Sequence, residues 1–294
     1  MAKSIVITGA GGQVGHELAT SESRHRIIAL TRRELDISSA EQIDETFNRV
    51  KPELVINAAA YTDVDRAESE SSLAYAINRD GVERLSEACR NASIPLFHLS
   101  TDYVFDGSRQ GAYRESDPIA PLGIYGASKA AGEAMVREIL EQHLILRTSW
   151  VFSWQENNFV HKILRLGRER TELAIVDDQR GCPTSARSIA SVLIQIAEAY
   201  LDGLEMRWGT FHYCNRPATT WYEFAREIFR LTGGFENLKL KAISAADYPT
   251  PAKRPSNSVL DCTKIESAYG IQSIYWPGEL AAQFSQNNFA SRDR

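Results

Sequence analysis

The chain has 294 residues, of which 43% are hydrophobic and 24% are charged, a composition typical of a globular protein with one large or two medium domains. Lys and Arg number 33 against 38 Asp and Glu, so the formal net charge is −5, which gives no electrostatic reason to bind nucleic acid or an anionic membrane. No apolar run approaches the roughly 18 residues of a membrane span and no signal-peptide pattern opens the chain, so we expect a cytoplasmic protein.

The first half of the chain alternates short apolar runs with stretches of helical periodicity. Strands are predicted at Ser4–Ile7, Arg26–Leu30, Leu54–Asn57, Pro95–Ser100 and Leu144–Arg147. Helices are predicted between them at Gln13–Ala19, Ser39–Val50, Leu73–Asn91 and Ser128–Glu141. Nearly continuous apolar strands separated by helices are typical of βαβ units. We therefore expect an α/β fold in which residues 1–150 form an NAD(P)-binding, Rossmann-type doubly wound parallel sheet.

The rhythm of the pattern changes after Trp150. A strand is predicted at Leu173–Val176 and a long amphipathic helix at Ala186–Tyr200, whereas prolines interrupt shorter segments from Gly203 onward. We expect residues 151–294 to form mainly a smaller, mixed α/β substrate-binding portion, with the segments around residues 173–200 as candidates to return to the first domain.

Three glycines, Gly9, Gly12 and Gly15, follow the first predicted strand and open the first predicted helix, with Gln13 and Val14 between them. In a dinucleotide-binding turn, the first glycine permits the tight turn and the second lets backbone N–H groups approach a pyrophosphate. The third lets helix and strand pack closely. The pattern and its context predict binding of a dinucleotide pyrophosphate, and a structural loop without a ligand is the alternative.

The end of the second predicted strand bears on the choice of cofactor. An acidic residue at this point normally accepts the unphosphorylated ribose of NAD, whereas an arginine suits the 2′-phosphate of NADP. The chain has Arg32 and Arg33 there and no acid at the tip, which favours NADP(H) with Arg32 as the contact. The alternative is that these arginines face solvent or pair with Glu34. Asp36 and Ile37 follow, where an adenine ring would rest.

Tyr125 and Lys129 are four residues apart, a spacing that puts both on one face of a helix. A phenol has a pKa of about 10, and a nearby ammonium stabilises the phenolate and lowers that pKa toward neutrality. Thr101 follows a predicted strand at the edge where parallel sheets bind ligands, so its hydroxyl can reach both the phenol and a substrate oxygen. These three residues are the predicted catalytic residues. A chance Tyr–Lys pair on a helix surface is the alternative.

The motifs resemble those of the extended short-chain dehydrogenases/reductases and, more narrowly, those of the dTDP-4-dehydrorhamnose reductase family. The resemblance runs from about residue 4 to beyond residue 280. The matching segments are Gly12–Gly15, Val55–Thr62, Ser100–Phe105, Tyr125 with Lys129, Arg147–Val151, Asp178–Gln179, Pro183–Thr184, Tyr248–Pro251 and Arg254–Ser258.

This resemblance implies an oxidoreductase of dTDP-rhamnose biosynthesis that uses NADPH, with NADH as the alternative, to reduce the C4 ketone of dTDP-4-dehydro-β-L-rhamnose to dTDP-L-rhamnose. Tyr125 would donate the proton, and Lys129 would lower its pKa and hold the nicotinamide ribose. The implied substrate contacts are Thr101, Asp102, Trp150 and Arg254, the last at the nucleotide diphosphate. The implied cofactor contacts are Gly9, Gly12, Gln13, Val14, Gly15, Arg32, Asp36, Ile37, Ala60, Tyr61, Thr62, Tyr125 and Lys129.

Two departures from related patterns refine this expectation. Related sugar-nucleotide dehydratases place an acid directly after the Thr-Asp pair, whereas Tyr103 stands there in this chain, which favours reduction over elimination. Some family members dimerise around Mg²⁺ held by glutamates. Glu17 matches one such position, but Arg187 stands at another and would favour a salt bridge over a metal.

The remaining metal-binding residue types give no other site. The four cysteines and six histidines are dispersed without zinc-ligand spacing, a pattern that suits a reducing cytoplasm. We therefore expect no metal, no nucleic-acid or membrane partner, and a monomer or weak homodimer.

Two alternative functions remain open at this level. The first keeps the chemistry and changes the substrate to a different nucleotide-linked 4-keto-6-deoxysugar. The second is a non-catalytic regulatory subunit resembling the β subunit of methionine adenosyltransferase.

Overall fold

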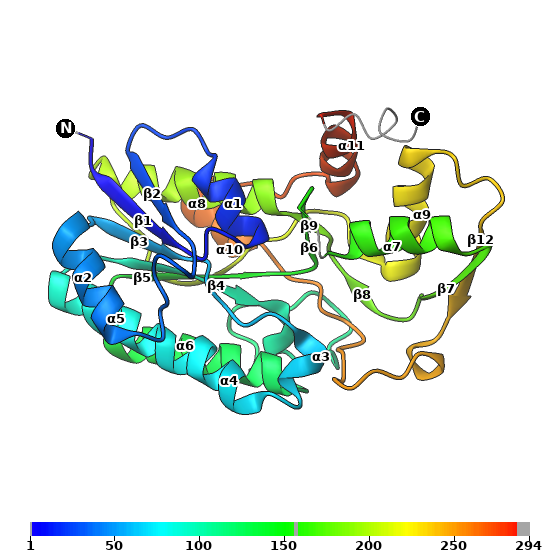
Figure 1. Cartoon of the computed structure of the whole chain (residues 1–294), viewed down its shortest axis with the longest axis horizontal. Coiled ribbons are helices and arrows are strands. Elements are labelled where there is room, and N and C mark those ends of the chain that lie inside the picture. Colours follow the sequence, from blue (N-terminus) through cyan, green and yellow to red (C-terminus); the bar gives the residue numbers. More distant parts are fainter. Residues whose placement is uncertain (1, 156–157, 287–294) are drawn as a thin grey trace.

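A six-stranded parallel sheet forms the centre of the computed structural model, which describes residues 2–155 and 158–286. The strand order is β10-β5-β4-β3-β1-β2 (Figure 1). The strands are β1 (Ser4–Thr8), β2 (Arg26–Leu30), β3 (Leu54–Asn57), β4 (Leu96–Thr101), β5 (His143–Thr148) and β10 (Gly209–His212). The chain runs from β1 to β2 on one side and then crosses to β3 on the other, which creates the kind of switch point where such sheets bind ligands. The predicted α/β class and doubly wound sheet are confirmed.

Helices cover both faces of this sheet (Figure 1). One face carries α1 (Gln13–Ala19), α8 (Ala186–Leu201) and α10 (Thr263–Tyr269). The other face carries α2 (Ala40–Val50), α5 (Val82–Ala92) and α6 (Ile124–Ile139). Successive strand residues alternate between the two cores: Ile5 and Ile7 pack beneath α1 and α8, and Val6 packs on the opposite side. Because both faces are covered, the strands are apolar throughout, which is the pattern seen in the sequence.

The helical segment after β3 differs from the prediction of one helix over Leu73–Asn91. After α3 (Val64–Ala67), the chain forms α4 (Ser71–Tyr75), a π-helix over Ala76–Gly81, and then α5. Asn78 lies in the π-helix, accepts a hydrogen bond from the Tyr61 N–H at 2.9 Å and donates to Ser128 Oγ at 3.0 Å. The wider turn thus directs an amide between the loop after β3 and helix α6, a tertiary interaction that periodicity does not reveal.

Helix α6 begins at Ile124 rather than at the predicted Ser128. The Ile124 N–H donates to Glu68 Oε1 at 2.8 Å, so a side chain remote in sequence satisfies a donor of the first turn. A Cβ on Gly126 would lie 2.1 Å from the Tyr103 carbonyl oxygen, which shows how closely this turn approaches the segment after β4. The earlier start places Tyr125 inside the helix.

A second, smaller part adjoins the sheet and is also mixed α/β (Figure 1). It contains the parallel pair β7 (Glu172–Val176) and β12 (Lys239–Ile243) and the helices α7 (Phe159–Glu169), α9 (Trp221–Thr232) and α11 (Trp276–Gln286). Its own core includes Phe152, Ile163, Leu173, Phe224 and Trp276. Short pairs, β6 (Val151–Phe152) with β9 (Thr184–Ser185) and β8 (Arg180–Gly181) with β11 (Thr219–Thr220), join the two parts.

The chain passes between these parts more than once. After β9, α8 packs on α1 and the sheet, and β10 pairs with β5. Part of residues 151–294 therefore lies with the first sheet, whereas β7 stays in the second part. The division at residue 150 remains a prediction. No helix in the described part of the chain combines the length and apolar character needed to cross a membrane.

Candidate active site

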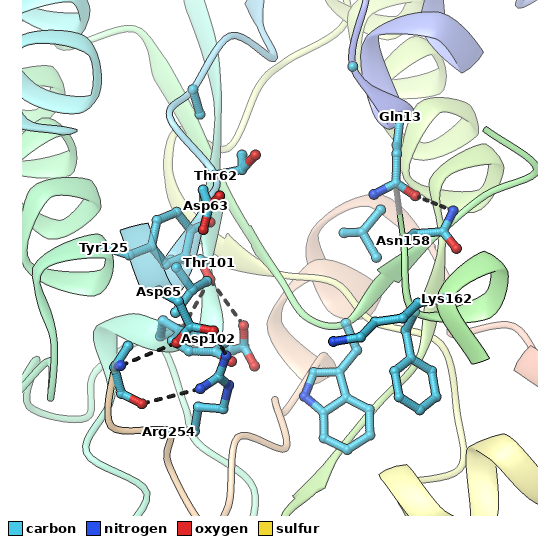
Figure 2. Close-up of a pocket in the computed structure, with 18 of the residues that line it drawn as sticks. Gln13, Thr62, Asp63, Asp65, Thr101, Asp102, Tyr125, Asn158, Lys162 and Arg254 are labelled. Carbon is cyan, nitrogen blue, oxygen red and sulfur yellow. Dashed lines mark hydrogen bonds and ion pairs between the residues drawn. The ribbon is translucent and has the colours of Figure 1, made fainter. Parts of the chain in front are cut away.

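A large pocket lies at the carboxyl ends of β1 to β5, between the sheet and the second part of the molecule. Its volume is about 1950 Å³, larger than the roughly 300–1,000 Å³ of a typical small-molecule site. This space is sufficient for a dinucleotide next to a second ligand. Figure 2 shows Tyr125, Thr101 and Asp102 on one side of the pocket and Gln13, Asn158 and Lys162 on the other.

The glycine turn after β1 has the close packing that its sequence predicts. Gly9 has φ +72°, and a Cβ on it would lie 2.5 Å from the Ala59 nitrogen. A Cβ on Gly15 would lie 2.0 Å from the Gly9 carbonyl oxygen, so only glycine lets α1 approach the turn this closely. Gly9, Gly12, Gln13 and Val14 line the pocket, whereas Gly15 packs behind the turn and is not among the described lining residues.

The segment after β2 brings Arg32, Asp36 and Ile37 to the pocket, as predicted from the order of residues. Arg32 Nε donates to Asp36 Oδ2 at 3.1 Å, and its side chain is 69% exposed. Glu34 instead accepts hydrogen bonds from the Thr31 N–H and hydroxyl, both at 2.8 Å. The Arg32 guanidinium therefore lies at the solvent-exposed rim of the pocket, where an ion pair with Asp36, four residues later in the chain, holds it.

The loop after β3 places Ala58, Ala59, Ala60 and Thr62 along the pocket. The Tyr61 hydroxyl donates to Glu70 Oε2 at 2.7 Å, and Tyr61 is not among the described lining residues. Its backbone N–H and carbonyl are bound by the Asn78 amide. The side chain and the backbone of Tyr61 are thus held by intramolecular hydrogen bonds, and its predicted contact with the cofactor stays a prediction.

Tyr125, Lys129 and Thr101 line the same pocket. Thr101 ends β4, donates to Asp102 Oδ1 at 3.1 Å and accepts the Tyr103 N–H at 3.2 Å. Lys129 Nζ donates to the Leu99 carbonyl at 2.7 Å and lies 3.3 Å from His98 Nε2. The Tyr125 ring meets the Tyr103 ring edge to face, with centroids 5.6 Å apart. One end of β4 and one face of α6 therefore bring the three predicted catalytic side chains together.

Burial dominates the electrostatics of these groups. It raises the pKa of Tyr125 to about 12, with an opposing hydrogen bond from Thr101 and a further increase from the Asp102 charge. It lowers the pKa of Lys129 to about 8, partly offset by Glu133. The sequence predicts a lowered Tyr125 pKa, and the structure shows the opposite direction. The reason is that a phenolate here would lose hydration, while Lys129 Nζ is directed toward β4.

Asp102 is almost fully buried at the floor of the pocket. Burial raises the pKa of its carboxyl to about 7, with opposing hydrogen bonds from Ser258 and Thr101. A carboxyl with this pKa can hold or release a proton near neutral pH.

Trp150 has φ +46°, an uncommon conformation for a bulky residue. Its ring stacks on Trp221 with centroids 3.6 Å apart and planes 6° from parallel. A Cβ on Gly181 would lie 2.3 Å from the same ring, so glycine leaves the space that the indole occupies. The strained backbone and these two neighbours fix an aromatic face at the pocket.

The structure adds pocket residues that the sequence analysis did not predict. Asn158 Nδ2 and Ser153 Oγ donate to Gln13 Oε1 at 3.1 and 2.9 Å, which joins the glycine turn to the loop before α7 (Figure 2). Asp65 is also new, and its Oδ2 forms an ion pair at 2.8 Å with Nη2 of Arg254, which the sequence analysis did predict. Lys162 extends from α7 into the pocket on the side opposite Arg254 (Figure 2). Lys162 is the fourth residue of α7, whose N-cap is Asn158, and no motif in the sequence analysis marks it.

Comparisons with known proteins agree with this site. The model of the RmlD substrate binding domain family matches residues 3–288. The chain is 47% identical to a dTDP-4-dehydrorhamnose reductase of Aggregatibacter actinomycetemcomitans over 283 residues, which cover 94% of this chain and 96% of the relative. It is 38% identical to that of Escherichia coli strain K12, with 93% and 94% covered.

Solved structures give the same result. A dTDP-4-dehydrorhamnose reductase from Clostridium acetobutylicum superposes with a TM-score of 0.90 at 35% identity, covering 97% of this chain and 99% of that one. The enzyme from Bacillus anthracis, in complex with NADP, superposes with a TM-score of 0.88 at 34% identity, covering 97% and 100%. The predicted resemblance is confirmed: this chain belongs to the RmlD substrate binding domain family, the family of these NAD(P)H-dependent oxidoreductases.

Proposed function

We propose that this chain reduces the C4 ketone of dTDP-4-dehydro-β-L-rhamnose to dTDP-L-rhamnose with NADPH, and that Tyr125 donates the proton. The observation that carries the proposal is that Tyr125, Lys129 and Thr101 line one pocket with the glycine turn. Its relatives at 47% and 38% identity are named for this reaction.

The residues of the pocket fit a dinucleotide. The backbone of Gly9 and Gly12 can approach a pyrophosphate because no Cβ intervenes, and Asp36 and Ile37 line the pocket where an adenosine would lie. Arg32 at the rim can turn from Asp36 to a 2′-phosphate, since its exposed ion pair is worth less than about 1 kcal/mol. When bound, NADPH supplies the hydride. The Bacillus anthracis relative binds NADP, which supports this choice of cofactor.

Tyr125 supplies the acid in this proposal. Because burial raises the pKa of Tyr125 to about 12, the phenol carries its proton at neutral pH. The C4 alkoxide produced by reduction is a stronger base than a phenolate, so the proton moves from the Tyr125 hydroxyl to the C4 oxygen. The Thr101 hydroxyl forms a hydrogen bond with the Tyr125 hydroxyl, and this hydrogen bond orients the phenol.

Tyr103 stands where related dehydratases carry an acid. Its ring packs edge to face on Tyr125, and burial raises the pKa of its phenol above the ordinary value. A neutral, buried phenol is a poor acid for expelling a hydroxyl group. This observation favours simple reduction of the ketone.

Two cations support a diphosphate-bearing substrate. The Arg254 guanidinium is held by Asp65 at 2.8 Å, and Lys162 approaches from α7 on the opposite side (Figure 2). Within the described residues, Lys162 forms no salt bridge, but its charge helps to lower the pKa of the Asp65 carboxyl, so the cation acts on the same part of the pocket as the Arg254–Asp65 pair. A planar fork and a point charge on two sides suit the oxygens of a diphosphate. Trp150 offers an apolar face for a deoxysugar ring.

The test is a substrate panel with the purified chain alone. NADPH oxidation is followed with 4-keto-6-deoxysugars linked to dTDP, UDP and GDP, and each is repeated with NADH. We expect the highest kcat/KM for the dTDP-4-dehydrorhamnose substrate with NADPH. Equal kcat/KM for NADH would contradict the cofactor preference. Preference for another sugar would change the substrate, and lack of turnover with every sugar would contradict catalysis and favour a regulatory subunit.

A further inference from the structure

His98 is a buried histidine of β4 that contacts Lys129 and has no role in the function proposed above. Its Nδ1 lies 3.0 Å from Asn57 Nδ2, and its Nε2 lies 3.3 Å from Lys129 Nζ. Both ring nitrogens are therefore engaged, one from β3 and one from α6. Which nitrogen carries the proton decides what Lys129 meets.

Asn57 fixes the polarity of this network. Its Oδ1 accepts the Ala59 N–H at 3.1 Å and the Thr8 hydroxyl at 2.6 Å. A backbone N–H can only donate, so the oxygen of the amide must face Ala59 and the NH₂ group must face His98. The His98 Nδ1 atom is consequently an acceptor.

A neutral imidazole that accepts at Nδ1 carries its proton on Nε2. The Nε2–H of His98 then points at Lys129 Nζ, where an ammonium would oppose one donor with another. A neutral amine instead offers a lone pair to Nε2–H, donates one N–H to the Leu99 carbonyl at 2.7 Å, and retains a second N–H. The network thus matches the uncharged form of Lys129.

We propose that His98 is a positioning residue that is held by Asn57 in its Nε2–H tautomer and stabilises the neutral amine of Lys129 against the ammonium. His98 thereby sets the pH above which Lys129 loses its charge. Ionisable groups from three elements surround this network. The Glu133 carboxylate of α6 favours the ammonium and is itself paired with Arg147 of β5, while the Tyr125 phenol of α6 and the Asp102 carboxyl after β4 line the same pocket as Lys129.

Burial supports the same assignment. Burial and the Lys129 charge hold the pKa of His98 well below its ordinary value, which excludes the doubly protonated ring at neutral pH. Burial also lowers the pKa of Lys129 to about 8. Both shifts have the direction that the hydrogen-bond polarity requires.

The first test is nitrogen-15 NMR of the histidine-labelled full chain without substrate. We expect His98 to carry its proton on Nε2 and to stay neutral when the pH is lowered through about 6.5, the ordinary pKa of an imidazole. A proton on Nδ1, or an imidazolium at neutral pH, would overturn the proposal. This measurement needs no enzymatic activity, so it fails or succeeds independently of the proposed function.

The second test is Asn57→Asp, which keeps the acceptor for Ala59 and Thr8 and replaces the donor to His98 with an acceptor. Two donors on its other oxygen favour the ionised carboxylate. The His98 proton should move to Nδ1, and Nε2 should accept from the Lys129 ammonium. The alkaline limb of the pH profile of kcat/KM reports the pH above which Lys129 loses its charge. We expect this limb to shift upward by about one to two pH units, the size of one charge-assisted hydrogen bond.

Asn215→Asp is the matched control. Asn215 is also buried, accepts the Ser185 N–H at 2.8 Å and faces the Tyr213 hydroxyl, but it lies outside the pocket. It should leave the alkaline limb in place. This kinetic arm rests on the proposed function. A folded, active Asn57→Asp enzyme with an unmoved limb would overturn the role of His98 while leaving the reductase activity intact.

Discussion

Two buried charges on helix α6, Lys129 and Glu133, lie one turn apart and face neighbouring parts of the sheet. Glu133 is bound on several sides: Arg147 Nη2 and Nε donate to it at 2.6 and 2.8 Å, and Arg137 and Ser100 also donate. Lys129 contacts only neutral partners among the hydrogen bonds of the described residues, the Leu99 carbonyl and the His98 ring. The first charge is compensated and the second is not.

The difference appears in the pKa values. Burial would raise the pKa of Glu133, but hydrogen bonds and the charge of Arg147 outweigh it and lower the pKa below its ordinary value. Burial lowers the pKa of Lys129 to about 8, and the Glu133 charge offsets this shift only in part because its carboxylate does not hydrogen-bond to the ammonium. The buried ion pair between Glu133 and Arg147 holds α6 against β5. The Lys129 cation has no such partner and therefore stays titratable and available for chemistry.

The prediction with the largest expected effect concerns Tyr125, the proposed proton donor, which lies one turn before Lys129 on α6. Tyr125→Phe removes the proton donor but keeps the ring against Tyr103. We expect kcat to fall by about 10²–10⁴-fold, the usual contribution of a positioned acid, with little change in the Kd for NADPH. Steady-state kinetics and cofactor titration would measure the two effects separately.

Tyr200→Phe is the control for this variant. Tyr200 lies on α8, packs edge to face against Trp208 and is not among the described residues that line the pocket. It should retain the original kcat. A kcat near the original value in Tyr125→Phe would show that another group donates the proton. The face of α6 that carries Tyr125 and Lys129 would then not be catalytic.

Substitutions at the partners of Glu133, the compensated charge of α6, should lower the free energy of unfolding. Arg147→Met leaves Glu133 buried without its main partner, so we expect the free energy of unfolding to fall by about 3–5 kcal/mol in urea titrations. Arg137→Met removes a guanidinium that binds the same carboxylate but is 37% exposed. Its cost should be below about 1 kcal/mol. Equal losses in the two variants would contradict the distinction between buried and exposed partners.

The smallest effect is expected at Lys162, an exposed cation that lines the pocket. Lys162→Met removes the cation on α7 opposite Arg254, and we expect KM for the nucleotide sugar to rise about tenfold with kcat little changed. Because the side chain is exposed, the effect should weaken at high ionic strength. Lys241→Met, on exposed β12 outside the pocket, should change neither constant. An unchanged KM in Lys162→Met would remove α7 from substrate binding.

Local pattern accounts for much of the site. The strand at Arg26–Leu30 and the helix at Gln13–Ala19 have the bounds that the sequence predicted, because burial on both faces and 3.6-residue periodicity leave a direct trace in the order of residues. The spacing of Tyr125 and Lys129, and the glycines of the turn after β1, are likewise local. Their meeting in one pocket follows from the parallel topology, in which all strand ends share one edge.

The sequence by itself therefore determined the class of sheet, the glycine turn and the Tyr–Lys pair, because each depends on neighbours within a few residues. Only the tertiary structure decided the start of α6 at Ile124, whose N–H Glu68 accepts, the cation from α7 opposite Arg254, the contact of Tyr61 with Glu70, and the direction of the Tyr125 pKa. It also decided the polarity of His98, which β3 imposes through Asn57. Burial and hydrogen-bond direction depend on residues that are distant in the chain, and no local pattern encodes them.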